Sequence, residues 1–160
     1  AGTTVYIFNK DILGKSSVAI PTMLDLKTHA DKDSMFNTPP VFSVYASMLT
    51  LRWLKSIGGL DSIEKINNQK AELVYNEIDT NPLFSGTAEV EDRSTMNATF
   101  RLNNEELNEE FMSMLSDANI SGLKGHRSVG GFRASMYNAM PLESVKTLVD
   151  VMQELTNKKG

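Results

Sequence analysis

The final segment of the chain, PLESVKTLVDVMQELTNKK at 141–159, most constrains how the chain can fold. Its apolar residues recur three and four positions apart and form one stripe: Leu142, Val145, Leu148, Val149, Met152 and Leu155. This spacing is typical of an amphipathic helix, and a proline suits its first turn. Because such a helix is stable only when its stripe is covered, the chain must supply an apolar surface against it.

Strand regions and a second amphipathic helix precede that segment and can supply this surface. STMNATFRL at 94–102 predicts a strand, and NNEELNEEFMSMLSDAN at 103–119 predicts a capped acidic helix. ISGLKG at 120–125 and SVGGFRASMY at 128–137 predict one or two further strands. Strands and helices interleaved in this way predict a small α+β domain over 80–160.

Two longer helices are predicted between Pro40 and the break at Asn81. VFSVYASMLTLRWLKSIGG at 41–59 has apolar residues at helical spacing and ends in two glycines. DSIE then opens the next helix, with Asp61 as N-cap and Glu64 at the third helical position. We expect a Gly-Gly bend to join the two helices.

The start of the chain carries weaker signals. Thr3 to Phe8 is rich in β-branched and aromatic residues, which predicts an interior strand without a nearby partner. Residues 9–36 show no sustained period and predict a long loop with a short strand near Met23–Leu26. The lone strand and the missing initiator methionine lead us to expect a fragment of a longer protein.

Composition argues against several classes of function. Sixteen lysines and arginines against twenty acidic residues give a formal charge of −4, which does not favour a nucleic-acid or anionic-membrane surface. The chain has no cysteine, and its two histidines, His29 and His126, lie far apart in the sequence, so we expect no metal site. No apolar run reaches the roughly 20 residues of a membrane span. We expect a cytoplasmic protein.

GHRSVGGFR at 125–133 places one histidine and two arginines around a pair of glycines. Arginine binds carboxylate or phosphate through a planar fork of donors, and histidine can add another donor. This set suits a ligand with two anionic ends. The alternative is that His126 and Arg127 are solvated turn residues and that Arg133 pairs with a carboxylate of the chain. The residues alone leave both interpretations open.

SMFNTPP at 34–40 is a second unusual segment, since Asn-Thr before Pro-Pro favours a rigid, extended turn. Asn37 and Thr38 could donate hydrogen bonds to a phosphate. The alternative is that one of them caps the helix that follows.

Together, SMFNTPP, LRWLKSIGGL at 51–60 and GLKGHRSVGGFRASMYNAMPLESVKTLVDVM at 122–152 resemble the C-terminal part of the phosphoserine aminotransferase family. These are fold-type I, class V enzymes that depend on pyridoxal phosphate. The opening AG resembles the end of the family's K-N-x-G-P-A-G segment, so the Schiff-base lysine is expected upstream of Ala1. Val41 departs from the pattern, where threonine is frequent.

The resemblance implies a fold that is part α/β and part α+β. Residues 1–39 would end the large cofactor-binding domain, 40–79 would form a helical connection, and 80–160 would form the small C-terminal α+β domain. It also implies that Asn37 and Thr38 reach the cofactor phosphate in the neighbouring subunit's active site, hence a homodimer. None of the chain's own lysines fits the Schiff-base position, so the chain alone is expected to be inactive.

The resemblance further implies that His126 and Arg127 bind the substrate phosphate and that Arg133 binds the α-carboxylate. The implied reaction transfers the amino group of L-glutamate to 3-phosphohydroxypyruvate and gives O-phospho-L-serine for serine biosynthesis. 4-Phosphohydroxythreonine, from pyridoxine biosynthesis, is a further candidate substrate. The rival interpretation is a non-enzymatic α+β module that binds a small dianion. An RNA-binding sheet is disfavoured by the acidic balance and by the lack of aromatic residues beside the basic cluster.

Overall fold

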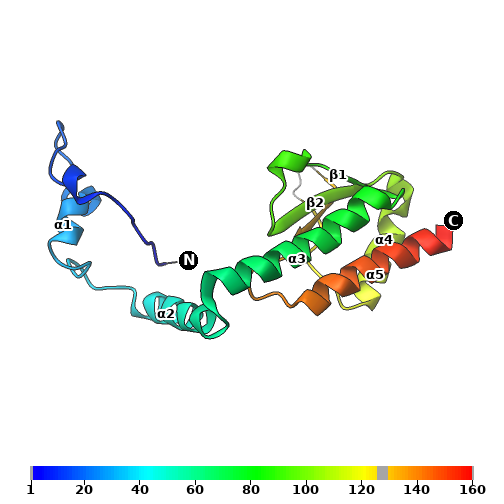
Figure 1. The fold of residues 1–160 in the computed structure, drawn as a ribbon. Helices are drawn as coiled ribbons and strands as arrows, with labels where there is room; N and C mark the ends of the chain where they lie inside the picture. The colour runs from blue at the N-terminus through cyan, green and yellow to red at the C-terminus, as the bar shows by residue number, and fades with distance from the viewer. Residues whose placement is uncertain (1, 126–129, 160) are drawn as a thin grey trace. The chain divides into compact units, whose positions relative to one another are not determined.

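A computed structural model describes residues 2–125 and 130–159 of the 160-residue chain (Figure 1). The chain divides into two compact units, residues 1–56 and 57–160, and each is described here by itself. None of the described helices combines the length and the apolar composition that crossing a membrane requires.

The first unit contains little regular structure before its last helix. Two 3-10 turns, Lys10–Ile12 and Thr22–Leu24, precede the short helix α1, Leu26–Ala30, and the longer helix α2, Val41–Ser56. Helix α2 confirms the helix predicted from residue 41. None of the described side chains of this unit is buried.

Both strands predicted in the first unit are wrong. Residues 3–8 are irregular, and Val5 and Ile7 are 79% and 97% exposed. A strand needs a neighbouring strand to pair its backbone groups, and the described part of this unit contains none. Near Met23 the chain instead forms a 3-10 turn, after which the Asp25 side chain accepts a hydrogen bond from the backbone N–H of Lys27 and starts α1.

The second unit is a three-stranded antiparallel sheet covered on one face by helices. The strands β1, Phe84–Gly86, β2, Asn97–Leu102, and β3, Phe132–Ser135, pair in the order β1-β2-β3. Helices α3, Gly59–Thr80, and α5, Leu142–Lys159, lie side by side along the sheet (Figure 1). Helix α4, Asn108–Asp117, follows a 3-10 turn at Glu105–Leu107, and a further 3-10 turn, Val90–Asp92, lies between β1 and β2.

Several predicted elements of this unit are confirmed with different boundaries. Helix α3 begins at Gly59, so Asp61 lies inside the first turn and the predicted N-cap is wrong. Gly58 and Gly59 both have positive φ, 105° and 74°, so the helical conformation is interrupted at the predicted pair of glycines. Helix α4 is shorter than the predicted 103–119, since the chain enters it through the 3-10 turn capped by Asn104. Strand β1 was not predicted.

Four phenylalanines form the centre of the core. Phe100 stacks on Phe132 with ring centroids 5.5 Å apart, and Phe111 of α4 meets Phe132 edge-on at 5.0 Å. Phe84 of β1 meets Phe111 at 5.3 Å. All four are buried, together with the apolar stripe residues Val145, Leu148, Val149, Met152 and Leu155 of α5. The predicted stripe of 141–159 therefore covers the sheet, as its spacing required.

Buried apolar and exposed polar side chains alternate along the strands, so the sheet has one apolar and one polar face. In β2, Ala98, Phe100 and Leu102 are buried, whereas Arg101 between them is exposed. In β3, Phe132 and Ala134 are buried and Arg133 is exposed. We call the uncovered polar side, which carries Ser85, Asn97, Thr99, Arg101, Arg133 and Ser135, the open face.

Lys70 of α3 ties this helix to the chain after β3. Its side chain is 0% exposed, and its ammonium donates hydrogen bonds to the carbonyls of Met136, Tyr137 and Met140 at 3.0, 2.9 and 3.3 Å. Burial lowers the pKa of Lys70. The N–H of Met136 donates to the carbonyl of Met96 at 2.7 Å. The end of β3 is thus held from two sides.

We predict that Lys70→Met lowers the free energy of unfolding by about 1–3 kcal/mol, because three carbonyls, at least partly buried, lose their donor while the side-chain length is kept. Lys65→Met, on the exposed side of the same helix, is the matched control and should change it by less than about 0.5 kcal/mol. Urea unfolding of the chain, followed by circular dichroism, measures both values. Equal losses in the two variants would contradict a specific role for Lys70.

Candidate functional site

Arg133 is the predicted substrate-binding residue that the structure describes, because His126 and Arg127 lie outside the described residues. It stands on β3, opposite Thr99 of β2, and its backbone N–H donates to the carbonyl of Leu123 at 2.7 Å. None of the five ion pairs among the described residues includes its guanidinium. Within that part of the chain, the alternative interpretation that Arg133 pairs with a carboxylate is therefore wrong.

The open face around Arg133 is polar and carries no acidic residue among its six strand positions. Its hydroxyl and amide groups are hydrogen-bonded: Thr87, which follows β1, donates to Thr99 at 2.6 Å, and Ser135 donates to Asn97 at 3.1 Å. With guanidinium groups and without carboxylates, the surface attracts anions.

Two glycines, Gly125 and Gly131, allow close backbone contacts just before Arg133. The N–H of Gly125 donates to the carbonyl of Gly131 at 2.9 Å, and Lys124 bridges to Phe132. A Cβ at Gly125 would overlap the carbonyl oxygen of Gly130, and one at Gly131 would lie 2.6 Å from the carbonyl oxygen of Phe100. Glycine is required at both places so that the backbones can approach.

These glycines also explain why β3 is shorter than predicted. Gly130 and Gly131 have φ of +73° and +62°, a conformation that interrupts a strand, so β3 begins at Phe132 instead of continuing through the predicted 128–137. Arg133 is consequently the second residue of the strand.

Asn37 and Thr38 lie in the first unit, on the exposed segment between α1 and α2. The Asn37 side-chain amide donates to the carbonyl of Thr38 at 3.2 Å, and the Thr38 hydroxyl has no hydrogen-bond partner among the described residues. Helix α2 begins only at Val41, so the structure does not bear out the capping alternative for either side chain. The Thr38 hydroxyl and the second Asn37 N–H are available donors, which fit a phosphate group such as that of pyridoxal phosphate.

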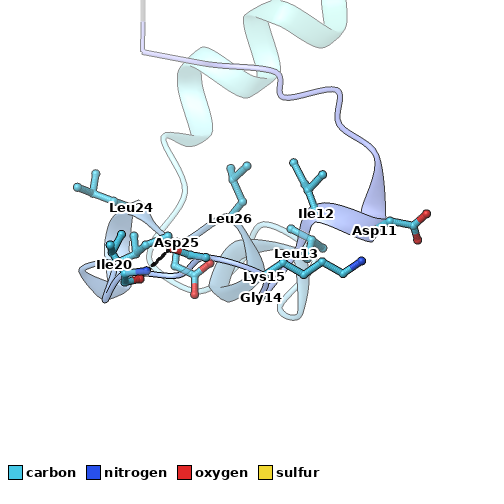
Figure 2. Close-up of a pocket in the computed structure, with 11 residues that line it drawn as sticks. Asp11, Ile12, Leu13, Gly14, Lys15, Ile20, Leu24, Asp25 and Leu26 are labelled. Atoms are coloured by element: carbon cyan, nitrogen blue, oxygen red, sulfur yellow. Dashed lines mark hydrogen bonds between the residues drawn. The ribbon is translucent and has the colours of Figure 1, made fainter.

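Hollows occur in both units of the described residues, and the one in the first unit is lined by none of the predicted site residues. It measures about 770 Å³ and is lined mainly by apolar side chains; in Figure 2, Ile12, Leu24 and Leu26 project to the same side while Asp11 points away. In the second unit, a cavity of about 270 Å³ lies beside Arg133, and a groove of about 890 Å³ runs between α4 and Gly131. Only the second unit combines a hollow with predicted anion-binding groups.

Arg101 belongs to the same open face and was missed from the sequence. The alternation within 97–102 is enough to place it on the face opposite Phe100. Its position beside Arg133, however, depends on how β2 pairs with β3, which the sequence did not reveal.

Comparison with known proteins identifies what the chain is similar to. The family model described as aminotransferase class V matches residues 1–148. The chain is 63% identical over 158 residues to a phosphoserine aminotransferase of Flavobacterium psychrophilum and 49% identical over 160 residues to one of Porphyromonas gingivalis. Both alignments cover 99% of this chain and 44% of the relative, so the chain spans less than half of these relatives' length.

Solved structures agree with the sequence comparison. The phosphoserine aminotransferase of Bacillus circulans subsp. alkalophilus matches with a TM-score of 0.86 at 42% identity, covering 94% of this chain and 42% of that one. A PLP-bound phosphoserine aminotransferase of Trichomonas vaginalis matches with a TM-score of 0.76 at 36% identity, covering 84% and 39%. The predicted resemblance and the mixed fold class are confirmed. The division at 39 and 79 stays a prediction.

We predict that Gly131→Ala destabilises the second unit more than Gly130→Ala does. Both substitutions place alanine at positive φ, which costs about 1 kcal/mol, but a Cβ at Gly130 meets nothing within 4 Å, whereas one at Gly131 meets the Phe100 carbonyl. The clash should add roughly 1–3 kcal/mol. Urea unfolding of the two variants measures the difference, and equal stabilities would show that β2 and β3 do not need this close approach.

Proposed function

This chain belongs to the aminotransferase class V family, and on that basis we propose that it is the C-terminal part of a phosphoserine aminotransferase. The enzyme would transfer the amino group of L-glutamate to 3-phosphohydroxypyruvate and form O-phospho-L-serine in serine biosynthesis. The observation that carries the proposal is the guanidinium of Arg133 on the open face, without a carboxylate partner among the described residues. The high identity to phosphoserine aminotransferases supports the same substrate class.

Both substrates of this reaction carry two anionic ends. Arg133 would bind the α-carboxylate that they share, through the bidentate geometry that guanidinium favours. His126 and Arg127, which the structure does not describe, would bind the phosphate of the phosphorylated substrate. Glutamate would place its side-chain carboxylate at the same end. One set of residues would thus serve both halves of the reaction.

Pyridoxal phosphate, when bound, supplies the electron sink that amino transfer requires. Asn37 and Thr38 would hold its phosphate at the active site of a neighbouring subunit, so the working enzyme would be a homodimer. The cofactor-binding lysine would lie in another part of a longer protein. Lys70 would not take its place, because it is buried and committed to three backbone carbonyls.

The proposal leaves room for a second phosphorylated substrate. 4-Phosphohydroxythreonine carries the same carboxylate and phosphate ends, so the same residues would accept it, and pyridoxine biosynthesis is included in the proposal on that ground. A cytoplasmic location also belongs to the proposal, since the substrates are small soluble metabolites.

We predict that the full-length protein aminates 3-phosphohydroxypyruvate with glutamate and added pyridoxal phosphate, whereas this chain alone does not. The reason is that the chain provides substrate-binding groups without the cofactor-binding lysine. A coupled assay of 2-oxoglutarate release measures both proteins. Turnover by the chain alone would contradict the proposal that the cofactor-binding lysine lies outside it. Phosphoserine binding without turnover in the full-length protein would favour the non-enzymatic dianion-binding module.

We predict that Arg133→Ala in the full-length enzyme weakens the binding of both substrates, because it removes a charge-assisted contact worth roughly 2–5 kcal/mol when desolvated. Arg127→Ala should affect 3-phosphohydroxypyruvate more strongly than glutamate, because only the former carries a phosphate. Comparing kcat/KM for the two half-reactions separates the cases. Equal losses for both substrates in both variants would contradict the assigned roles.

A further inference from the structure

Arg101 lies next to Arg133 on the open face. Strand pairing sets Thr99 opposite Arg133 and Phe100 opposite Phe132, which places Gly131 opposite Arg101. Arg101 and Arg133 are therefore diagonal neighbours on adjacent strands, with Cβ atoms roughly 7–8 Å apart, well within reach of two long side chains. Two guanidinium groups thus project from the same small area of the sheet.

These two like charges are not neutralised within the described residues. The Arg101 Nε donates to the Ser85 hydroxyl at 3.3 Å, and neither Arg101 nor Arg133 takes part in an ion pair of the described chain. Like charges directly opposite each other destabilise a sheet, and diagonal neighbours remain within reach of long side chains, so the two guanidiniums repel one another. Two neighbouring positive charges that lower the stability of the sheet are expected where a bound anion offsets their repulsion.

Arg93, in the same unit, is an arginine with a structural role and serves as a comparison for Arg101. Its guanidinium makes two hydrogen bonds to the Asp79 carboxylate, at 2.6 and 2.7 Å, and lies 4.6 Å over the Tyr75 ring. The hydrogen bond from Arg93 holds the pKa of Asp79 below its ordinary value. Arg101 has no comparable partner among the described residues, so packing and internal pairing do not explain its charge.

Gly131 keeps the space beside Arg101 free. A Cβ built at Gly131 would lie 3.3 Å from the Cβ of Arg101, so any larger residue at 131 would crowd the base of the Arg101 side chain. Because position 131 is a glycine, no side chain stands beside the two arginines at this position.

We propose that Arg101 is a second anion-binding residue of the substrate site, and that it binds the same carboxylate end as Arg133. This inference rests on the proposed function, which assigns that end to Arg133. Two arginines at neighbouring positions of one face suit the α-carboxylate common to glutamate and the phosphorylated substrate, because each guanidinium can offer a pair of N–H donors. Arg101 would exchange its hydrogen bond to Ser85 for this carboxylate. Arg101 would raise the affinity for both substrates without touching the reacting atoms.

The test compares Arg101→Gln with wild-type full-length holoenzyme. KM for both glutamate and 3-phosphohydroxypyruvate should rise about fivefold, the effect of losing one partly exposed charge pair, while kcat stays the same. Arg101→Lys should recover part of the loss, since it keeps the charge and loses the fork. Lys65→Gln removes the same charge from the exposed side of α3 and should leave both KM values unchanged.

The outcomes separate this inference from the proposed function. If the wild-type enzyme is active and Arg101→Gln leaves both KM values unchanged, the inference is overturned and the proposed function stands. A KM increase for 3-phosphohydroxypyruvate only overturns the assignment to the shared carboxylate. A wild-type protein that turns over neither substrate overturns the proposed function and the inference with it. Because Arg101 is exposed, the variant is expected to keep the wild-type unfolding midpoint, which circular dichroism checks.

Discussion

The stacking of Phe100 on Phe132 decides which way the side chains of β2 and β3 point. Both rings are buried, with centroids 5.5 Å apart, and the period of a strand then sends the next residue of each, Arg101 and Arg133, to the open face. A slip of one residue would turn Arg133 into the core. An unpaired buried guanidinium is so costly that the aromatic pair and the arginine select the same register.

Short as it is, β3 is held at both of its ends. Before it, Gly131 lets the backbone approach the Phe100 carbonyl; after it, Met136 is bonded to Met96 through its N–H and to Lys70 through its carbonyl. These contacts lie outside the open face and leave it free. A binding side chain on such a strand has a fixed direction before any ligand arrives, which reduces the entropy lost on binding.

The sequence predicted those parts of the fold that local patterns determine. The helices from 41 and 141 and the strand within 94–102 carry their own periodicity, and the structure confirms them. The strand expected at 3–8 is absent, because a strand depends on a partner that sequence periodicity does not supply. Arg133 was predicted from its residue type beside two glycines, whereas Arg101 required the pairing of β2 with β3. The roles of Asn37, Thr38, His126, Arg127 and Arg133 stay predictions.

The two units differ in how far they stabilise themselves, and this bears on how the proposed functions are divided. The second unit buries its own phenylalanine core, so the open face with Arg101 and Arg133 belongs to a self-supporting scaffold. The first unit buries none of its described side chains and leaves Val5 and Ile7 largely exposed, so the segment with Asn37 and Thr38 has no comparable support within its own unit. The proposed carboxylate binding would therefore be preorganised by this chain, whereas the proposed binding of the cofactor phosphate would depend on apolar surface that covers the first unit.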